Sequence, residues 1–409
     1  MIVLSGADLV LPDRVIAGGT LVLDGDRIAD VIQDSVSSTD LPPVTVNFSF
    51  RDHYIVPGFI DVHVHGVEGI DTLDGGAAIA TMAERLPRYG VTAFCPTSIA
   101  CDPSALRQML AGVRLARTTR PPGGARVLPA HLESNFINPE YKGAQPLACL
   151  RLPPQAATHK DADAGTAGTW QGAEILDEIA AARPDVGIVT VAPELEGALE
   201  LIADLAAHGH HISLGHSGAT YEQALAGIRA GARQATHLFN RMPPLGHRVP
   251  GLAAAVLESD EVFAELICDA VHVHPAMMRV AIATKRPERI MAITDGTAGS
   301  GLPKGTRATI GGFPITIRDA AYLEDGTLAG SSLTMDRAFA KLTSEVGLSL
   351  SDAAMACAAT PARALGLQGF GVISPGAAAD LVVLDRDLQV VQTWIAGTLA
   401  WERASKPTV

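Results

Sequence analysis

The sequence predicts an α/β fold: a (β/α)8 TIM-like barrel with a small β-sandwich domain formed by both chain ends. From residue 56 to about residue 348, short apolar strand patterns alternate with helical patterns rich in Ala and Leu. This alternation has the order and size of such a barrel. Both ends of the chain are instead rich in β-forming residues and tight turns, and neither is long enough to form a core alone. A doubly wound sheet is the alternative, but no GxGxxG motif follows the first strand.

We therefore expect residues 1–55 and 356–409 to pair as the β-sandwich, with residues 56–355 inserted between them as the barrel. A hairpin is expected at Asp24-Gly25-Asp26. The strands expected at the two ends are Ile2–Leu4, Ala7–Leu11, Gly19–Leu23, Arg27–Ile32, a stretch near Val44–Phe50, Ala379–Leu384 and Val390–Gly397.

The barrel elements follow from the two hydrophobic periodicities, two residues for strands and 3.6 for helices. The expected strands lie in the stretch Val56–Gly66 and at Val91–Pro96, Ala125–Glu133, Val186–Pro193, His211–His216, Ala232–Phe239, Val262–Val273 and Arg289–Asp295. The expected helices are Ala77–Arg88, Pro103–Ala116, Gly172–Ala182, Leu195–Ala207, Thr220–Ala230 and Pro275–Thr284.

The composition favours a compact cytoplasmic protein that acts on a small molecule. Apolar residues make up 47% of the 409 residues and charged residues 18%, which argues against disorder. The net charge of −13 disfavours nucleic acid or an anionic membrane as a partner. The five cysteines include no CxxC pair, which is typical of a reducing compartment. The N-terminus lacks the features of a signal peptide, and no stretch approaches the ~20 apolar residues of a membrane helix.

The stretch Val56–Gly66 carries the first chemical signal. It ends in His63 and His65, two residues apart, and such side chains project from the same face of a strand. Two imidazoles placed in this way can share a divalent cation. A pair of packed core histidines is the alternative, and the metal interpretation requires further ligands from distant parts of the chain.

Polar residues recur at the carboxyl ends of the predicted strands. They are His63 and His65, Glu133, His216, His237, His272 and Asp295. In a barrel all these ends meet at one face, the usual position of an active site. Imidazoles combined with carboxylates favour Zn²⁺ or Fe²⁺ over Ca²⁺ or Mg²⁺.

Two of these residues have side chains suited to hydrolysis, one for proton transfer and one for stabilising the charge that develops on the substrate. Asp295 can act as base toward an attacking water and then as acid toward the leaving nitrogen. A turn cap before Gly296 is its alternative role. His272 can hydrogen-bond a carbonyl oxygen as it becomes an oxyanion.

A basic loop follows the sixth predicted strand. It contains Asn240, Arg241, His247 and Arg248 within eleven residues of His237. On an acidic chain, such a loop is an expected anion receptor, and Arg suits phosphate well. A solvated basic loop is the alternative.

These residues resemble the amidohydrolase superfamily, and within it the N-acetylglucosamine-6-phosphate deacetylase family. The matching stretches are Pro57-Gly58-Phe59-Ile60-Asp61, His131-Leu132-Glu133, Phe136-Ile137-Asn138-Pro139, Gly215-His216-Ser217, Thr236-His237-Leu238-Phe239-Asn240-Arg241-Met242-Pro243, Pro250-Gly251-Leu252, Asp269-Ala270-Val271-His272-Val273, Thr294-Asp295-Gly296 and Gly330-Ser331-Ser332-Leu333-Thr334-Met335. They spread over the whole predicted barrel. The fourth strand has no lysine of the kind that dihydroorotase-like members use to bridge two metals.

The resemblance implies a metal-dependent deacetylase of an N-acetylhexosamine 6-phosphate. It implies that Glu133, His216 and His237 hold the main metal, that His63 and His65 match members that bind a second one, and that one or two ions are bound per subunit. Asp295 is implied as the catalytic acid and base, and a homodimer is implied, in which the loop arginine reaches the neighbouring subunit. The residues implied to line the sugar phosphate pocket are Ala144, Gln145, Asn240, Arg241, Arg248, His272, Leu328, Ala329 and Gly330.

Two departures from the family pattern bear on the sugar. Ser134-Asn135 replaces the usual Gly-Pro after the metal-binding glutamate, and Arg241 replaces a small residue. N-acetylgalactosamine 6-phosphate is therefore an alternative substrate. An amidohydrolase that acts on an amide without phosphate, and a non-catalytic binding module on the same barrel, are also compatible with the predicted fold.

Overall fold

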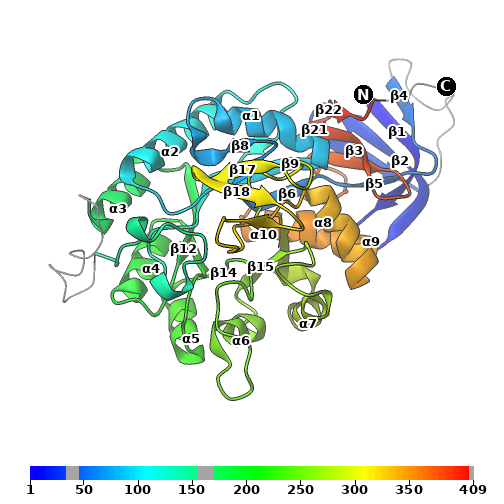
Figure 1. Cartoon of the computed structure of the whole chain (residues 1–409). Coiled ribbons are helices and arrows are strands. Elements are labelled where there is room, and N and C mark those ends of the chain that lie inside the picture. Colours follow the sequence, from blue (N-terminus) through cyan, green and yellow to red (C-terminus); the bar gives the residue numbers. More distant parts are fainter. Residues whose placement is uncertain (34–45, 155–169, 405–409) are drawn as a thin grey trace.

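The computed structural model describes residues 1–33, 46–154 and 170–404. These residues form a barrel with a smaller β domain packed against one side (Figure 1). Within them, no helix has both the length and the apolar character needed to cross a membrane. The strand expected near Val44–Phe50 is β4 (Val46–Ser49), and the first two residues of that expected range lie outside the described residues.

The barrel sheet is parallel throughout, and its eight expected strands are all present. Its strands are β6 (Phe59–Val64), β9 (Val91–Ser98), β10 (Arg126–Val127), β11 (Ala130–Leu132), β12 (Val186–Val191), β13 (His211–Leu214), β14 (Gln234–Ala235), β15 (Phe263–Ile267) and β16 (Ile290–Ile293). The third expected strand is split into β10 and β11 around Pro129, which has no N–H to donate to a ladder. A parallel bridge between Val64 and Gly296 joins the last strand to the first. The fold class predicted from the sequence is therefore confirmed.

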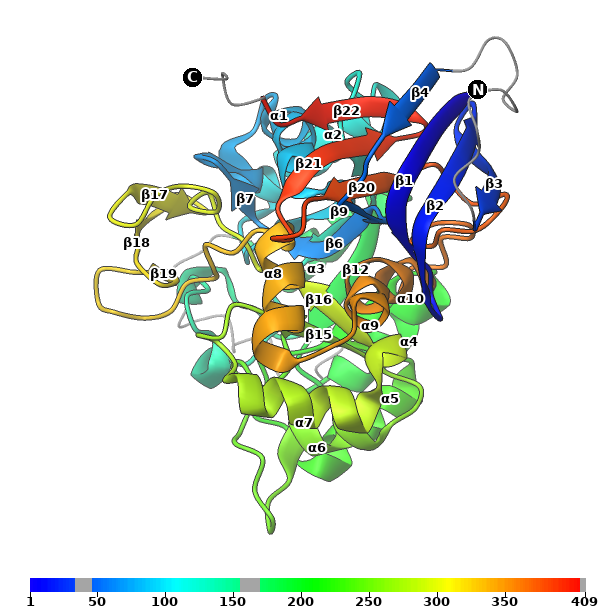
Figure 2. The same cartoon turned by 90° about the vertical axis from the view of Figure 1, so that its right-hand side faces the viewer.

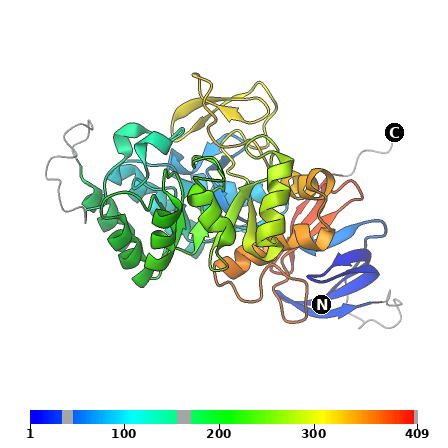
Figure 3. The same cartoon turned by 90° about the horizontal axis from the view of Figure 1, so that it is seen from below.

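Helices surround this sheet (Figure 3). They are α1 (Ala78–Arg85), α2 (Pro103–Thr118), α3 (Gly172–Ala181), α4 (Ala198–Ala207), α5 (Tyr221–Ala230), α6 (Gly251–Glu258), α7 (Pro275–Lys285), α8 (Met335–Lys341), α9 (Leu350–Ala354) and α10 (Thr360–Ala364). Helix α6 is absent from the sequence expectations. Six of its eight residues are buried, so it has no polar face to give the 3.6-residue pattern.

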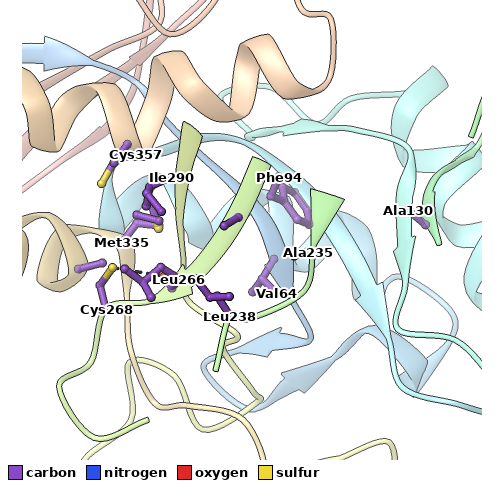
Figure 4. Close-up of a cluster of buried hydrophobic side chains, with 14 of the residues drawn as sticks. Val64, Phe94, Ala130, Ala235, Leu238, Leu266, Cys268, Ile290, Met335 and Cys357 are labelled. Carbon is purple, nitrogen blue, oxygen red and sulfur yellow. Dashed lines mark hydrogen bonds between the residues drawn. The ribbon is translucent and has the colours of Figure 1, made fainter. Parts of the chain in front are cut away.

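Two hydrophobic layers hold the barrel. The outer layer lies between strands and helices and includes Leu266, Cys268 and Met335, which Figure 4 draws close together. The inner layer fills the barrel itself with side chains of the opposite strand faces, such as Ile60 and Ile188. Because these inward-pointing side chains fill the barrel, its interior is a packed core, and a ligand can bind only at its two ends.

Both chain ends build the β domain, as predicted. Its mixed sheet has the order β22-β21-β20-β5-β1-β2-β3, with β4 paired to β1. The bounds are β1 (Ile2–Val10), β2 (Val15–Asp24), β3 (Arg27–Ile32), β5 (Tyr54–Pro57), β20 (Leu381–Leu384), β21 (Val390–Ile395) and β22 (Thr398–Glu402). Figure 2 shows the N- and C-terminal strands side by side. Residues from both ends, such as Leu21 and Trp394, share one hydrophobic cluster.

A small antiparallel sheet after β16 is also absent from the sequence expectations. It consists of β17 (Arg307–Ile310), β18 (Phe313–Ile317) and β19 (Ala321–Tyr322). Gly311 and Gly312 form its first turn with φ of 52° and 83°, and a Gly-Gly pair between β-forming runs is a hairpin signal. A further short pair, β7 (Gly66–Val67) and β8 (Ile70–Asp71), follows the first barrel strand. Both small sheets lie beside the carboxyl ends of the barrel strands, since β7 begins two residues after β6 ends and Ile310 lines the cavity described below.

Several barrel strands end one or more residues before their expected bounds, and two of them, β14 and β15, end at least four residues earlier. β14 ends at Ala235, and β15 ends at Ile267, five residues before His272. The carboxylate of Asp269 accepts hydrogen bonds from the backbone N–H groups of Val271 and His272, both at 2.8 Å. This local turn replaces the ladder, so His272 lies in a loop and not at the end of a strand.

Candidate active site

A cavity opens at the carboxyl ends of the barrel strands, with about 420 Å³ of empty space including its mouth. Its described lining residues are His65, Ile99, Glu133, Ala144, Gln145, His216, His237, Asn240, Arg241, His272, Asp295, Ile310, Leu328 and Gly330. They come from segments more than two hundred residues apart. The barrel therefore brings together most of the side chains that the sequence singled out.

Three side chains meet at the centre of this cavity. Oε1 of Glu133 lies 2.7 Å from Nε2 of His216 and 2.7 Å from Nε2 of His237. The two imidazole nitrogens are 3.1 Å apart and face each other. All three residues are at least 96% buried. Two imidazole nitrogens and one carboxylate oxygen facing a common point form a donor set suited to a zinc-like cation.

A second group adjoins the first. Nε2 of His63 and Nε2 of His65 are 3.2 Å apart, and Oε2 of Glu133 lies 3.5 Å from His65. Oδ1 of Asp295 lies 3.2 Å from Nε2 of His65 and 3.5 Å from Nε2 of His63. Glu133 thus stands between two histidine pairs: Oε1 contacts His216 and His237, and Oε2 lies nearest His65.

Contacts on the far side of the rings fix which nitrogen faces the cavity. Nδ1 of His216 lies 2.8 Å from the backbone oxygen of Tyr141, and Nδ1 of His63 lies 2.8 Å from Oε2 of Glu265. Each Nδ1 therefore carries the proton, since both partners are acceptors. Each Nε2 then presents a lone pair to the cavity, as a metal-binding histidine requires.

Glu265 and His131 support the site but were not assigned a role from the sequence. Glu265 is fully buried on β15, and Oε2 also accepts from the backbone N–H of His237 at 3.2 Å. His131, on β11, is hydrogen-bonded through Nε2 to the hydroxyl of Thr190 at 2.9 Å, and its Nδ1 is 3.1 Å from the backbone oxygen of Val62. The signal in the sequence is one carboxylate inside the apolar run 263–267, which a parallel strand buries.

Burial and neighbouring charges set the ionisation of these groups. Burial lowers the pKa of His63 to about 3, which keeps its ring neutral. Burial also raises the pKa of Glu265 to about 7. Burial opposes ionisation of Glu133 too, but the charge and hydrogen bond of His216 and the hydrogen bond of His237 hold its pKa well below the usual range. Burial also acts to lower the pKa of His65 and His237, but the hydrogen bonds and charges of Asp295 and Glu133 outweigh it: the pKa of His65 is raised, and that of His237 is raised to about 9. A cation that binds there would displace protons from these rings, since a histidine ligand is neutral.

Backbone strain is concentrated at the same residues. His216, His237 and Asp295 have φ of 47°, 31° and 48°, in the left-handed region that residues other than glycine seldom occupy. Each lies two residues after the end of a strand. A left-handed residue turns the chain sharply there and directs its side chain into the cavity. Such strain costs about 1–3 kcal/mol per residue and is typical of functional positions.

His272 also lines the cavity. Its Nδ1 lies 2.7 Å from Oδ2 of Asp269, so this nitrogen donates to the carboxylate. The ring is 95% buried, and its other nitrogen is left for the cavity. Asp269 fixes both the loop and the ring, and the sequence analysis gave it no separate role.

The residues expected to bind substrate divide into two groups. Ala144, Gln145, Asn240, Arg241, Leu328 and Gly330 line the cavity. Ala329 is fully buried in a hydrophobic cluster behind it, and its N–H is bonded to the oxygen of Ala321 at 3.0 Å. Arg248 is exposed and is not among the described lining residues of this chain's own cavity. It lies on the loop between β14 and α6, which projects away from the barrel (Figures 1 and 2).

Ser134 and Asn135 do not face the cavity. The hydroxyl of Ser134 donates to the backbone oxygen of Thr190, and the amide of Asn135 donates to those of Cys101 and Cys149, both at 2.8 Å. Neither residue is among those that line the cavity in the described chain. Of the two departures from the family pattern, only Arg241 is therefore in contact with the substrate space.

The sequence and the structure both match known hydrolases. A model described as the amidohydrolase family matches residues 54–400. The chain is 35% identical over 409 aligned residues to an N-acetylglucosamine-6-phosphate deacetylase of Rattus norvegicus, covering 95% of this chain and 94% of the relative. It is 34% identical to an N-acetylgalactosamine-6-phosphate deacetylase of Escherichia coli, covering 91% and 94% respectively.

A similar solved structure is that of a variant N-acetyl-D-glucosamine-6-phosphate deacetylase from Mycobacterium smegmatis in complex with N-acetyl-D-glucosamine-6-phosphate. Its TM-score to this chain is 0.85 at 32% sequence identity, and the alignment covers 98% of this chain and 99% of that one. The likeness therefore extends over both the barrel and the β domain.

Proposed function

This chain belongs to the amidohydrolase family, and on that premise we propose that it deacetylates an N-acetylhexosamine 6-phosphate, with N-acetylglucosamine 6-phosphate as its substrate. The products are the amino sugar 6-phosphate and acetate. The observation that carries the proposal is the meeting of Glu133, His216 and His237 in one cavity with Asp295 beside them. The full-length similarity to sugar phosphate deacetylases supplies the substrate class.

The proposed metal is Zn²⁺, with Fe²⁺ as the alternative, because imidazole and carboxylate donors suit both. Glu133, His216 and His237 would hold the main ion, and His63 and His65 would hold a second one together with Glu133. The facing nitrogens of each histidine pair support this assignment, since a cation between them relieves the repulsion of their lone pairs. A bound divalent cation supplies an acidified water and polarises the amide carbonyl.

Asp295 and His272 are proposed as the catalytic residues. Asp295 takes the proton of the attacking water on its Oδ1, which faces the histidines, and passes a proton to the leaving amine. His272 donates a hydrogen bond from Nε2 to the carbonyl oxygen as negative charge develops there. The carboxylate of Asp269 on Nδ1 fixes the orientation of the ring for this contact.

Asn240 and Arg241 are proposed to bind the phosphate, with Ala144, Gln145, Leu328 and Gly330 forming the surrounding wall and Ala329 packed behind it. Arg248 is proposed to complete the phosphate site of a neighbouring subunit in a homodimer. Its exposed position on a projecting loop, outside its own cavity, supports this role. A cytoplasmic location is proposed because no CxxC pair occurs among the five cysteines, a usage typical of a reducing compartment.

A substrate panel tests the proposal. Acetate release is measured with zinc-reconstituted protein on N-acetylglucosamine 6-phosphate, N-acetylgalactosamine 6-phosphate and plain N-acetylglucosamine. The expected kcat/KM is highest for the first compound and lower by at least about a hundredfold for the unphosphorylated sugar, because charge-assisted bonds to phosphate are lost. A higher kcat/KM on the galactosamine compound would assign the other sugar. Equal rates with and without phosphate would refute the substrate class.

A further inference from the structure

A second cavity lies at the opposite end of the barrel, where the strands begin. It has about 900 Å³ of empty space including its mouth, within the range of small-molecule sites. Residues 127–129 and 186–187, next to the starts of β11 and β12, form part of its wall, and Leu365 and Leu367 form another part. The loop carrying these two leucines follows α10 and packs against the inner core of the barrel. Among the described residues, none lines both this cavity and the candidate active site.

Basic side chains surround this second cavity. Arg117, Arg183, His208, His210 and His211 all line it, and none of its described lining residues is acidic. Arg117 is partly neutralised, because one of its nitrogens is bonded to Asp185 behind the wall. The exposed guanidinium of Arg183 has no hydrogen bond or ion pair to any described residue. On a chain with a net charge of −13, this grouping is suited to a small anion.

One buried atom in the wall lacks a partner. His210 is 93% buried, and its Nε2 has no hydrogen bond to any described atom. Its Nδ1 lies 3.0 Å from the backbone oxygen of Val186 and therefore carries the ring's proton. Burial lowers the pKa of His210, and the charge of Arg183 lowers it further, so the ring is neutral. Nε2 is consequently a free acceptor, and a buried acceptor without a donor costs about 1–3 kcal/mol.

From this arrangement we propose that the cavity is a binding site for a small hydroxylated organic anion. The anionic group pairs with Arg183 and Arg117, and a hydroxyl donates to Nε2 of His210. The carbon skeleton packs on Leu365, Leu367 and Val127, which form an apolar side of the cavity. The proposal does not depend on the reaction at the other end of the barrel.

Calorimetric titration of the full-length protein with 3-phosphoglycerate tests the site, because this probe carries anionic groups and a hydroxyl. Sulfate serves as an anion that has no hydroxyl. Wild-type protein is expected to bind 3-phosphoglycerate at least several-fold more tightly than sulfate. Equal affinities, or no binding of 3-phosphoglycerate at millimolar concentration, would overturn the proposal.

Variants locate the binding. Arg183→Glu is expected to weaken binding of 3-phosphoglycerate by at least about tenfold, since it reverses the unpaired charge. This side chain is exposed, so the fold is retained. Arg229→Glu is the matched control, because Arg229 is exposed near the C-terminal end of α5 and does not line the cavity. Binding that is unchanged in Arg183→Glu contradicts the site, as does binding that is lost in Arg241→Ala at the opposite mouth. His210→Phe, which removes the acceptor, is expected to abolish the preference over sulfate.

Discussion

The two ends of the barrel both gather histidines, and they use them in opposite ways. At the carboxyl ends of the strands, four imidazoles point their Nε2 atoms inward around Glu133, with Asp295 beside them. At the amino ends, His208, His210 and His211 accompany Arg117 and Arg183 without any carboxylate among the described lining residues. The first end is arranged for a cation and the second for an anion.

The difference comes from what stands behind each ring. At the mouth, a carboxylate or carbonyl oxygen behind His63 and His216 directs their lone pairs to one point, where Glu133 adds negative charge. In the second cavity, the backbone oxygen of Val186 also holds the proton of His210 on Nδ1, but the described lining residues there include Arg117 and Arg183 and no carboxylate. The same side chain thus serves as a cation ligand in one place and as an acceptor for a ligand hydroxyl in the other, according to its neighbours. Experiments that alter one end and not the other test this contrast.

Metal removal should have the largest effect and should act at one end only. Treatment with a chelator followed by its removal is expected to abolish deacetylation, and added Zn²⁺ is expected to restore it. Binding of 3-phosphoglycerate in the second cavity, where the strands begin, should remain, since that site has no carboxylate ligand among its described residues. If elemental analysis shows that a protein sample is metal-free and the sample is still fully active, the metal site assigned at the carboxyl ends of the strands would be contradicted.

Replacement of the proposed acid and base comes next. Asp295→Asn is expected to lower kcat by about 10²–10⁴-fold, because proton transfer is lost while the shape of the site is kept. Metal content, measured in the same preparation, should stay close to that of the wild type. Asp387→Asn, at an exposed position in the β domain, is the control and should leave kcat unchanged. Substantial residual turnover in Asp295→Asn would rule out the role given to this carboxylate.

A smaller effect is expected from the carboxylate behind His63. Glu265→Gln should weaken metal binding by about 10–100-fold, because outer partners orient the ligands and raise their basicity. Equilibrium titration with Zn²⁺ and a competing chelator measures this change. Glu261→Gln, at an exposed position shortly before β15, is the matched control. Unchanged affinity in Glu265→Gln would mean that the orientation of His63 does not depend on this contact.

The smallest effect concerns the projecting loop. Arg248→Ala is expected to raise KM for N-acetylglucosamine 6-phosphate by about tenfold, which corresponds to one lost charge-assisted hydrogen bond. The kcat/KM on plain N-acetylglucosamine should not change. Steady-state kinetics on both sugars, with Arg229→Ala as the control, separate the two. A loss of equal size on both sugars would show that Arg248 does not act on phosphate.

The sequence predicted the barrel and the ring of polar residues at its mouth, because both depend on local patterns. His63 and His65 end an apolar strand, and Glu133, His216 and His237 follow other strand patterns. The closed sheet then brings their side chains together. The ends of strands were less predictable: His272 lies beyond its strand because Asp269 bonds the backbone there.

Some features depend on contacts that no local pattern records. Helix α6 is buried on nearly all sides and lacks a polar face. The role of Glu265 follows only from its contact with His63. The second cavity is formed only where the starts of the strands meet the loop after α10. Ser134 and Asn135 were expected to bear on the choice of sugar, but they donate hydrogen bonds to backbone carbonyl oxygens and are not among the described residues that line the cavity.

The most direct test of the central claim is a crystal structure of the zinc-loaded protein, with data collected at the zinc absorption edge. We expect an anomalous peak at the point faced by Oε1 of Glu133 and the Nε2 atoms of His216 and His237, with Zn–N distances of about 2.0–2.1 Å. A zinc peak elsewhere in the molecule, with none at this point, would contradict it.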